Sequence, residues 1–137
     1  MFCYDCKVYI NHTDAGGIVY HANHLTFFEN CRREWLGSMG FGSYFLTLDE
    51  DTLHFVVSHA ELTYHAPLLV DDALSVTIDK VIQKPASLIL HQSIYRKQPI
   101  PQKASSAIIT LACVKNSSNG IRPTRLPAAF LDKLVVS

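Results

Sequence analysis

NHTDAGGIVYHANHLTFFENCRREWL, residues Asn11–Leu36, joins a polar loop with two adjacent glycines to a segment with helical periodicity. From about Asn23 onward, apolar residues recur at spacings of three, four and one, which is the pattern of one buried helix face. These residues are Leu25, Phe28, Cys31, Trp35, Leu36 and Met39. Glycines at positions 37, 40 and 42 end the pattern. The segment therefore predicts one long amphipathic helix that starts between His21 and Asn23, with a glycine loop in front of it.

The rest of the chain reads as β-strands joined by short connections. The expected strands cover residues 2–10, 53–66, 74–82, 88–95 and 104–114. A shift in the apolar phase at Val81–Ile82 predicts a bulge, Asn116–Gly120 reads as a turn or loop, and Pro127 opens a short last helix. No helix separates the later strands, so they should be antiparallel neighbours. The expected fold class is α+β, a single domain over residues 1–137 in which an antiparallel sheet wraps around one long central helix.

Composition and charge narrow the classes of function. The 137 residues carry 12 Lys plus Arg and 12 Asp plus Glu, so no net field attracts nucleic acid or an anionic membrane surface. No apolar run approaches the roughly 20 residues of a membrane span, and the first residues lack the basic and apolar parts of a secretory signal. We therefore expect a cytoplasmic protein with no nucleic-acid partner and no membrane insertion.

The cysteines and histidines give no metal-ligand pattern. Cys3 and Cys6 form a CxxC, but no second CxxC and no histidine pair follows at zinc-finger spacing. Residues three apart on a strand point to opposite faces, so these thiols are expected to be ordinary strand residues. The sequence therefore predicts no metal and no cofactor.

Asp14 is the first candidate for chemistry, because it lies in the glycine loop just before the helix start. Unpaired N–H groups at a helix N-terminus can hold a developing negative charge while a carboxylate attacks or activates water. The backbone N–H of His21 lies among those donors whatever its side chain does. On spacing alone, a turn-capping role for Asp14 is the better interpretation, because Asp is favoured in turns. No serine elbow or phosphate-binding glycine motif offers a rival site.

The amino-acid sequence of this loop resembles that of a known family. The run TDAGGIVYHAN at Thr13–Asn23, followed by FFE at Phe27–Glu29 and RREWL at Arg32–Leu36, is similar to the hotdog-fold acyl-CoA thioesterases. The branch it resembles includes the 4-hydroxybenzoyl-CoA and Tol-Pal-associated thioesterases. YHAP at Tyr64–Pro67 and DDAL at Asp71–Leu74 follow in family order, so the similarity covers essentially the whole chain. The resemblance favours a catalytic role for Asp14 over a turn cap.

This resemblance implies a hotdog domain, with a five-stranded antiparallel sheet around the central helix, that forms dimers or tetramers with active sites between subunits. Asp14 would act as nucleophile or general base on an acyl-CoA thioester. The backbone N–H of His21 would polarise the thioester carbonyl, and its imidazole is also implicated in the Tol-Pal-associated branch. Gly17 and Tyr20 would contact the substrate. Lys84 would meet the phosphates of coenzyme A.

The chain also departs from the family at several positions near Asp14. Ile10 stands where many relatives carry Tyr, an acidic residue is common at Asn11 or His12, and His24 stands where Tyr is common. The missing Tyr at Ile10 gives weight to a second hypothesis, in which the chain is a non-catalytic module that binds acyl-CoA or an acyl carrier protein. A hydratase on the same fold is a weaker third hypothesis. The sequence does not choose between the two roles of Asp14.

Overall fold

The computed structural model describes residues 1–42 and 53–136. Six strands and two α-helices follow one another in this part of the chain, with a single 3-10 turn after the first strand. In order they are β1 (Phe2–Lys7), η1 (Ile10–His12), α1 (Asn23–Ser38), β2 (Leu53–Tyr64), β3 (Ala73–Gln83), β4 (Ser87–Arg96), β5 (Gln102–Ser117), β6 (Gly120–Pro123) and α2 (Ala128–Val136). The helix start near His21 to Asn23 and the short last helix are confirmed.

The strands form one antiparallel sheet in the order β1-β3-β4-β5-β2, and β6 pairs with the far end of β5. The α+β class with an antiparallel sheet is therefore confirmed. The expectation of five strands is wrong for the described residues, because β5 continues to Ser117 and the chain then folds back on it. Gly120 permits this return with a φ of +105°, which glycine adopts without steric cost. The predicted loop at Asn116–Gly120 is thus partly strand.

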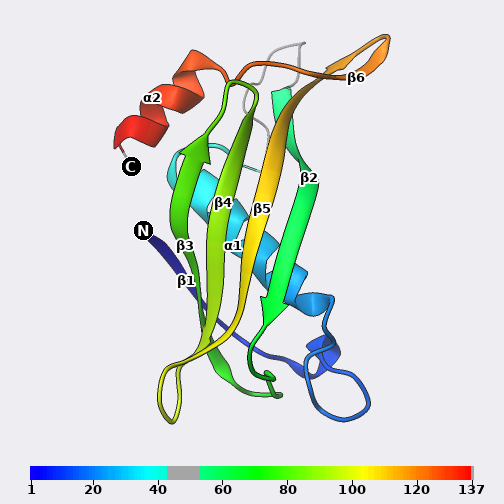
Figure 1. Ribbon diagram of the computed structural model, residues 1–137, viewed down its shortest axis with the longest axis vertical. Helices are drawn as coiled ribbons and strands as arrows, with labels where there is room; N and C mark the ends of the chain where they lie inside the picture. Colours follow the sequence, from blue (N-terminus) through cyan, green and yellow to red (C-terminus); the bar gives the residue numbers. More distant parts are fainter. Residues whose placement is uncertain (43–52, 137) are drawn as a thin grey trace.

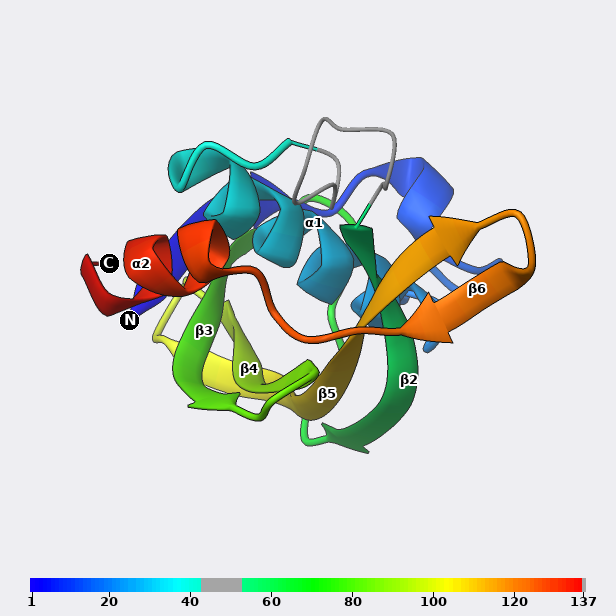
Figure 2. The same cartoon turned by 90° about the horizontal axis from the view of Figure 1, so that it is seen from above.

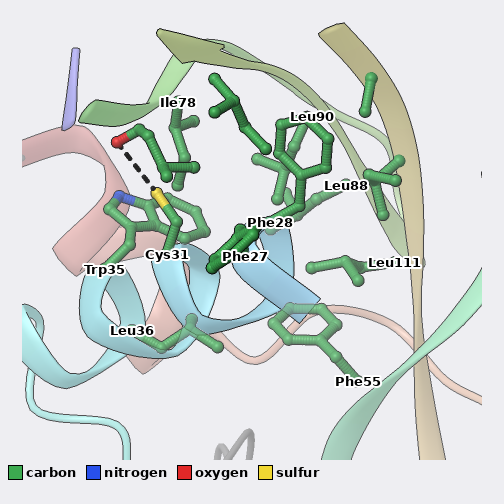
Figure 3. Packing of buried hydrophobic residues seen from close by; sticks show 14 of the residues in the cluster. Phe27, Phe28, Cys31, Trp35, Leu36, Phe55, Ile78, Leu88, Leu90 and Leu111 are labelled. Carbon is green, nitrogen blue, oxygen red and sulfur yellow. Dashed lines mark hydrogen bonds between the residues drawn. The ribbon is translucent and has the colours of Figure 1, made fainter. Parts of the chain in front are cut away.

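Helix α1 lies across the concave face of the sheet, and the strands curve around it (Figures 1 and 2). Phe28, Cys31 and Leu36 are fully buried. Figure 3 shows Phe28 pointing toward Leu88 and Leu90 of β4, and Cys31 beside Trp35 and Ile78. The Cys31 thiol also donates to the carbonyl oxygen of Val76 on β3, at 3.5 Å. Packing of this apolar stripe against the sheet is what holds the helix in place.

One position of the predicted helix face is wrong. Leu25 is 39% exposed, whereas Phe27, which was not assigned to the face, is 2% exposed. Each helical residue turns the side chain by about 100°, so Leu25 and Phe27 cannot both point to the sheet. Trp35 and Met39 are buried as predicted.

The first strand is shorter than expected and the bulge falls elsewhere. β1 ends at Lys7, whereas the strand was expected to reach Ile10, where η1 begins. Cys3 is exposed and Cys6 is half-buried, in line with opposite faces, and both thiols are free. The register of β3 shifts between Ile78 and Lys80 instead of at Val81–Ile82. The extra residue there is Asp79.

Strand β2 forms one edge of the sheet, with β5 as its only neighbour among the described strands. Its second half is largely exposed on both faces, including Val57 at 49% and Tyr64 at 47%. A long edge strand with exposed apolar side chains is a template for pairing with another chain. None of the described helices is both long and apolar enough to cross a membrane.

Candidate active site

The glycine loop closes on itself as a small hairpin. The Asp14 N–H donates to the Ile18 carbonyl at 2.9 Å, and the Gly17 N–H donates to the Asp14 carbonyl at 3.2 Å. Thr13 and Val19 form an isolated antiparallel bridge at its base. Gly17 has a φ of +77°, a conformation that L side chains rarely adopt. The second glycine of the motif is therefore required by the backbone.

The Asp14 carboxylate caps this turn and still offers a free oxygen. Its Oδ1 accepts the Gly16 N–H at 2.8 Å, and a Cβ at position 16 would lie only 3.3 Å from that oxygen. No described residue donates to its Oδ2, and the side chain is exposed. The turn-capping interpretation thus applies to Oδ1, and Oδ2 is the oxygen left for the catalytic interpretation.

One side-chain hydrogen bond attaches the hairpin to the helix, and a backbone hydrogen bond attaches it to the segment after β2. The His12 carbonyl accepts both the Tyr20 N–H at 3.1 Å and the Asn23 side-chain amide at 2.7 Å. The Val70 N–H donates to the Gly17 carbonyl at 3.2 Å. The loop carrying Asp14 is therefore held against the start of α1.

The His12 ring does not serve the Asp14 carboxylate. Its Nδ1 accepts the Tyr9 N–H at 2.9 Å, and the ring packs edge-on against Phe27 with centroids 4.8 Å apart.

Two adjacent N–H groups at the helix start are unpaired. The N–H groups of Asn23, His24 and Leu25 donate to carbonyls three residues earlier. In the part of the chain that the structure describes, no acceptor meets the N–H of His21 or of Ala22, and both residues are exposed. No side chain caps the helix at Ala22. These donors lie at the positive end of the helix dipole, so they suit a developing negative charge.

Sequence reasoning identified His21 and missed Ala22. The signal that could have found Ala22 was the rule that several consecutive N–H groups at a helix start lack partners. Applying it requires the first helical residue to be known to within one position, and sequence patterns leave that uncertain by more.

A buried histidine lies beside these donors. His24 is 3% exposed, and its Nδ1 shares a hydrogen bond of 2.8 Å with the Ser105 hydroxyl of β5. Burial lowers the pKa of His24 to about 4, with a further contribution from His21, so the imidazole is neutral at pH 7. Its ring meets Tyr64 edge-on, with centroids 4.9 Å apart. Such burial is typical of a histidine with a structural role.

The remaining predicted site residues fall at two separate places. The Tyr20 ring is 50% exposed and lies against the His21 ring, with centroids 4.5 Å apart. Lys84 lies in the turn between β3 and β4, at the end of the sheet away from the Asp14 loop (Figure 1). Eleven residues of β3 at about 3.3 Å each separate those ends, so Lys84 and Asp14 of one chain do not share a site.

Within the described residues, no group of three or more His, Cys, Asp or Glu side chains is placed to hold a metal ion. The arrangement instead offers one free carboxylate oxygen, two unpaired N–H groups and an exposed aromatic ring. Further exposed apolar side chains lie on the loop, on the first turn of α1 and on the segments bonded to them, namely Ile18, Leu25, Leu69 and Tyr64. Such a surface is typical of a binding site that a ligand or another chain covers.

Comparison with known proteins assigns the class. The model of the thioesterase-like superfamily matches residues 8–134. A relative from Haemophilus influenzae named acyl-CoA thioesterase YbgC is 36% identical over 113 residues, which cover 82% of this chain and 80% of the relative. A relative from Escherichia coli named acyl-CoA thioester hydrolase YbgC is 29% identical over 131 residues, covering 96% of this chain and 93% of that protein.

Solved structures agree on the fold. A 4-hydroxybenzoyl-CoA thioesterase mutant, crystallised with 4-hydroxybenzoyl-CoA, superposes with a TM-score of 0.85 at 16% identity, and the match covers 96% of each chain. The chain belongs to the thioesterase-like superfamily, the hotdog family that its sequence resembles. It is an enzyme of the thioester hydrolase class.

Proposed function

We propose that the chain hydrolyses acyl-CoA thioesters to a free acid and coenzyme A, with Asp14 and the start of α1 as its catalytic groups. The observation that carries this proposal is the free Asp14 oxygen on a hairpin tied to two unpaired N–H groups, those of His21 and Ala22. The names of the relatives from Haemophilus influenzae and Escherichia coli support acyl-CoA as the substrate.

The residues suit this chemistry because a thioester needs little assistance to break. Its thiolate is a good leaving group, so one carboxylate and a few oxyanion donors can suffice. The N–H groups of His21 and Ala22 would stabilise the charge that develops on the carbonyl oxygen. Removing one donor from an oxyanion site costs about 10²–10³ in turnover in other enzymes.

Asp14 can act by two routes. As a nucleophile, its oxygen bonds to the carbonyl carbon, the C–S bond breaks, and the coenzyme A thiolate takes a proton from water. The resulting mixed anhydride is then opened by a second water. As a general base, Asp14 takes a proton from a water molecule that attacks the carbonyl carbon directly, the C–S bond then breaks, and the coenzyme A thiolate takes up that proton. Both routes yield the same products.

A homo-oligomer fits the exposed edge of the sheet. Pairing of β2 with β2 of a second copy would cover Val57 and extend the sheet, and a dimer of such dimers would give the predicted tetramer. Because Lys84 lies far from Asp14 within one chain, its proposed contact with coenzyme A phosphates requires a second subunit to supply it. Gly17 and Tyr20 would line the substrate at the loop.

The expectations of a single hotdog domain over residues 1–137, of a cytoplasmic location and of an acyl carrier protein as a partner stay predictions.

An acyl-CoA panel tests the proposal. Short-chain, long-chain and aromatic acyl-CoAs are incubated with the wild type, with Asp14→Asn and with Asp132→Asn, and thiol release is measured. Asp132 is an exposed aspartate on α2, so its substitution is the matched control. We expect Asp14→Asn to lower kcat/KM by at least about 10²-fold, because it removes the nucleophile or base.

The outcome separates the proposal from its alternative. Thiol release that is equal in the wild type and Asp14→Asn would contradict it. Tight coenzyme A binding without turnover, unchanged in Asp14→Asn, would establish the binding module instead.

A further inference from the structure

Tyr64 joins the end of β2 to the start of α1. Its hydroxyl donates to the carbonyl oxygen of His21 at 2.9 Å. The residue is the last of β2, and Figure 1 shows this end of the strand beside the first turn of the helix. The side chain is 47% exposed, so it adds little to the apolar core. Its hydrogen bond therefore calls for an explanation other than packing.

The bond reaches the candidate oxyanion donor through one peptide unit. The carbonyl of His21 and the N–H of Ala22 belong to the same planar trans peptide, so they point in opposite directions. A hydroxyl that holds the oxygen therefore also sets the direction of the Ala22 N–H. Donation to the oxygen further polarises the N–H on the other side, because linked hydrogen bonds strengthen one another.

The same carbonyl oxygen accepts a second, longer bond from the His24 N–H, at 3.3 Å. A carbonyl has two lone pairs, so both donors can be satisfied. The Tyr64 bond is the shorter one, and it comes from outside the helix. It therefore fixes the peptide against the sheet, which the helix's own bond cannot do.

A neutral, buried histidine holds the Tyr64 ring. Tyr64 faces Ser105 in the β2–β5 register, and Ser105 in turn bonds His24, whose ring meets Tyr64 edge-on. The Tyr64 phenol carries the proton that it donates at neutral pH, and burial raises its pKa further above the usual value. The phenol thus approaches the helix start along one defined direction.

We propose that Tyr64 is a positioning residue for catalysis, which orients and polarises the Ala22 N–H through the carbonyl of His21. This inference rests on the proposed function, since it assigns the Ala22 N–H to the oxyanion. It extends that function to a side chain on another element, which acts on the oxyanion site through the His21–Ala22 peptide.

Two measurements on Tyr64→Phe test the proposal, with Tyr95→Phe as the matched control. Phe keeps the ring and its packing on His24 and removes only the hydroxyl. Tyr95 lies on β4, where its ring contacts Lys103 rather than α1. In the acyl-CoA assay, we expect Tyr64→Phe to lower kcat about fivefold to tenfold, the value of one hydrogen bond, with KM changed less than about twofold.

The second measurement does not depend on turnover. In isotope-labelled protein, the NMR resonances of the His21 carbonyl carbon and the Ala22 amide report hydrogen bonding at that peptide. We expect both to move in Tyr64→Phe and neither to move in Tyr95→Phe, with melting temperatures within about 2 °C of the wild type. If the Tyr64 hydrogen bond served only the stability of the fold, Tyr64→Phe would lower the melting temperature and leave kcat and KM as in the wild type.

Each other outcome has one meaning. Unmoved resonances in Tyr64→Phe, or moved resonances with an unchanged kcat, would overturn the positioning role while Asp14-dependent turnover keeps the proposed function intact. Wild-type protein that releases no thiol from any acyl-CoA would overturn the proposed function and this inference together.

Discussion

The two ends of α1 differ: the C-terminal end packs against other elements, and the N-terminal end leaves a backbone donor unpaired among the described residues. At the C-terminal end, Cys31, Trp35 and Leu36 are 6% exposed or less, and Trp35 meets Phe130 of α2 with ring centroids 6.5 Å apart. At the N-terminal end, Ala22 is exposed, has no side-chain cap and leaves its N–H unpaired within the described chain.

This difference shows that a helix can leave backbone N–H groups at its start unpaired when its other contacts stabilise it. Unpaired N–H groups at a helix start cost stability, and a side-chain cap there is typically worth about 1 kcal/mol. The buried face of α1 supplies stability that its uncapped first residues lack. Substitutions at the two ends should therefore separate stability from activity.

The largest effect is expected from a pair of identical truncations. Leu36→Ala removes a fully buried side chain at the packed end and should lower the free energy of unfolding by about 3–5 kcal/mol. Leu25→Ala, at the open end and 39% exposed, should cost less than about 1 kcal/mol. Urea unfolding measures both. Equal losses would break the contrast between the two ends.

The next effect is a pH dependence at the open end. The pKa of His24 falls from an ordinary value near 6.5 to about 4 in the folded chain, so between these pH values the unfolded state binds the extra proton. Stability from this residue is complete above pH 6.5 and is lost as the pH falls toward 4, by about 3 kcal/mol. The groups that face the ring are Ser105, Tyr64 and His21.

His24→Gln tests this dependence because Gln does not titrate. The unfolding free energies of wild type and variant are measured from pH 7 to pH 4. As the pH falls, the wild type should lose about 3 kcal/mol more than the variant. Curves that stay parallel would show that His24 is not the titrating group.

The smallest effect comes from two glycines, one in the loop and one in the helix. Gly17→Ala forces a Cβ onto a φ of +77° and should cost about 1–2 kcal/mol. Gly37→Ala, where a Cβ meets nothing within 4 Å, should stabilise the chain by about 0.5 kcal/mol. Thermal unfolding compares them. A Gly17→Ala variant as stable as Gly37→Ala would remove the backbone reason for the second loop glycine.

Much of this molecule follows from local patterns. The periodicity around Phe28 and Leu36 predicted α1 and most of its buried face, and Pro127 predicted the last helix, because helix periodicity and starting signals are local. The errors arose where distant partners decide. β5 continues to Ser117 because β6 returns to pair with it, and the bulge falls at Asp79, whose carboxylate accepts the Ser93 hydroxyl of the neighbouring strand at 2.7 Å.

The candidate site divides in the same way. Spacing alone favoured a turn cap for Asp14, and the family resemblance of the loop motif led to Asp14, Gly17 and His21 as site residues. Nothing local could connect Tyr64 to His21 across 43 positions, and nothing local could separate Lys84 from Asp14.

By itself, the sequence determined the family, the α+β class, the helix and the carboxylate in its glycine loop. Only the tertiary structure decided which N–H groups are left without acceptors, which oxygen of Asp14 is free, and which distant side chain holds the peptide at the helix start. The physical reason is that periodicity and turns depend on neighbours in sequence, whereas an unpaired donor or a shared carbonyl depends on every segment that packs around it.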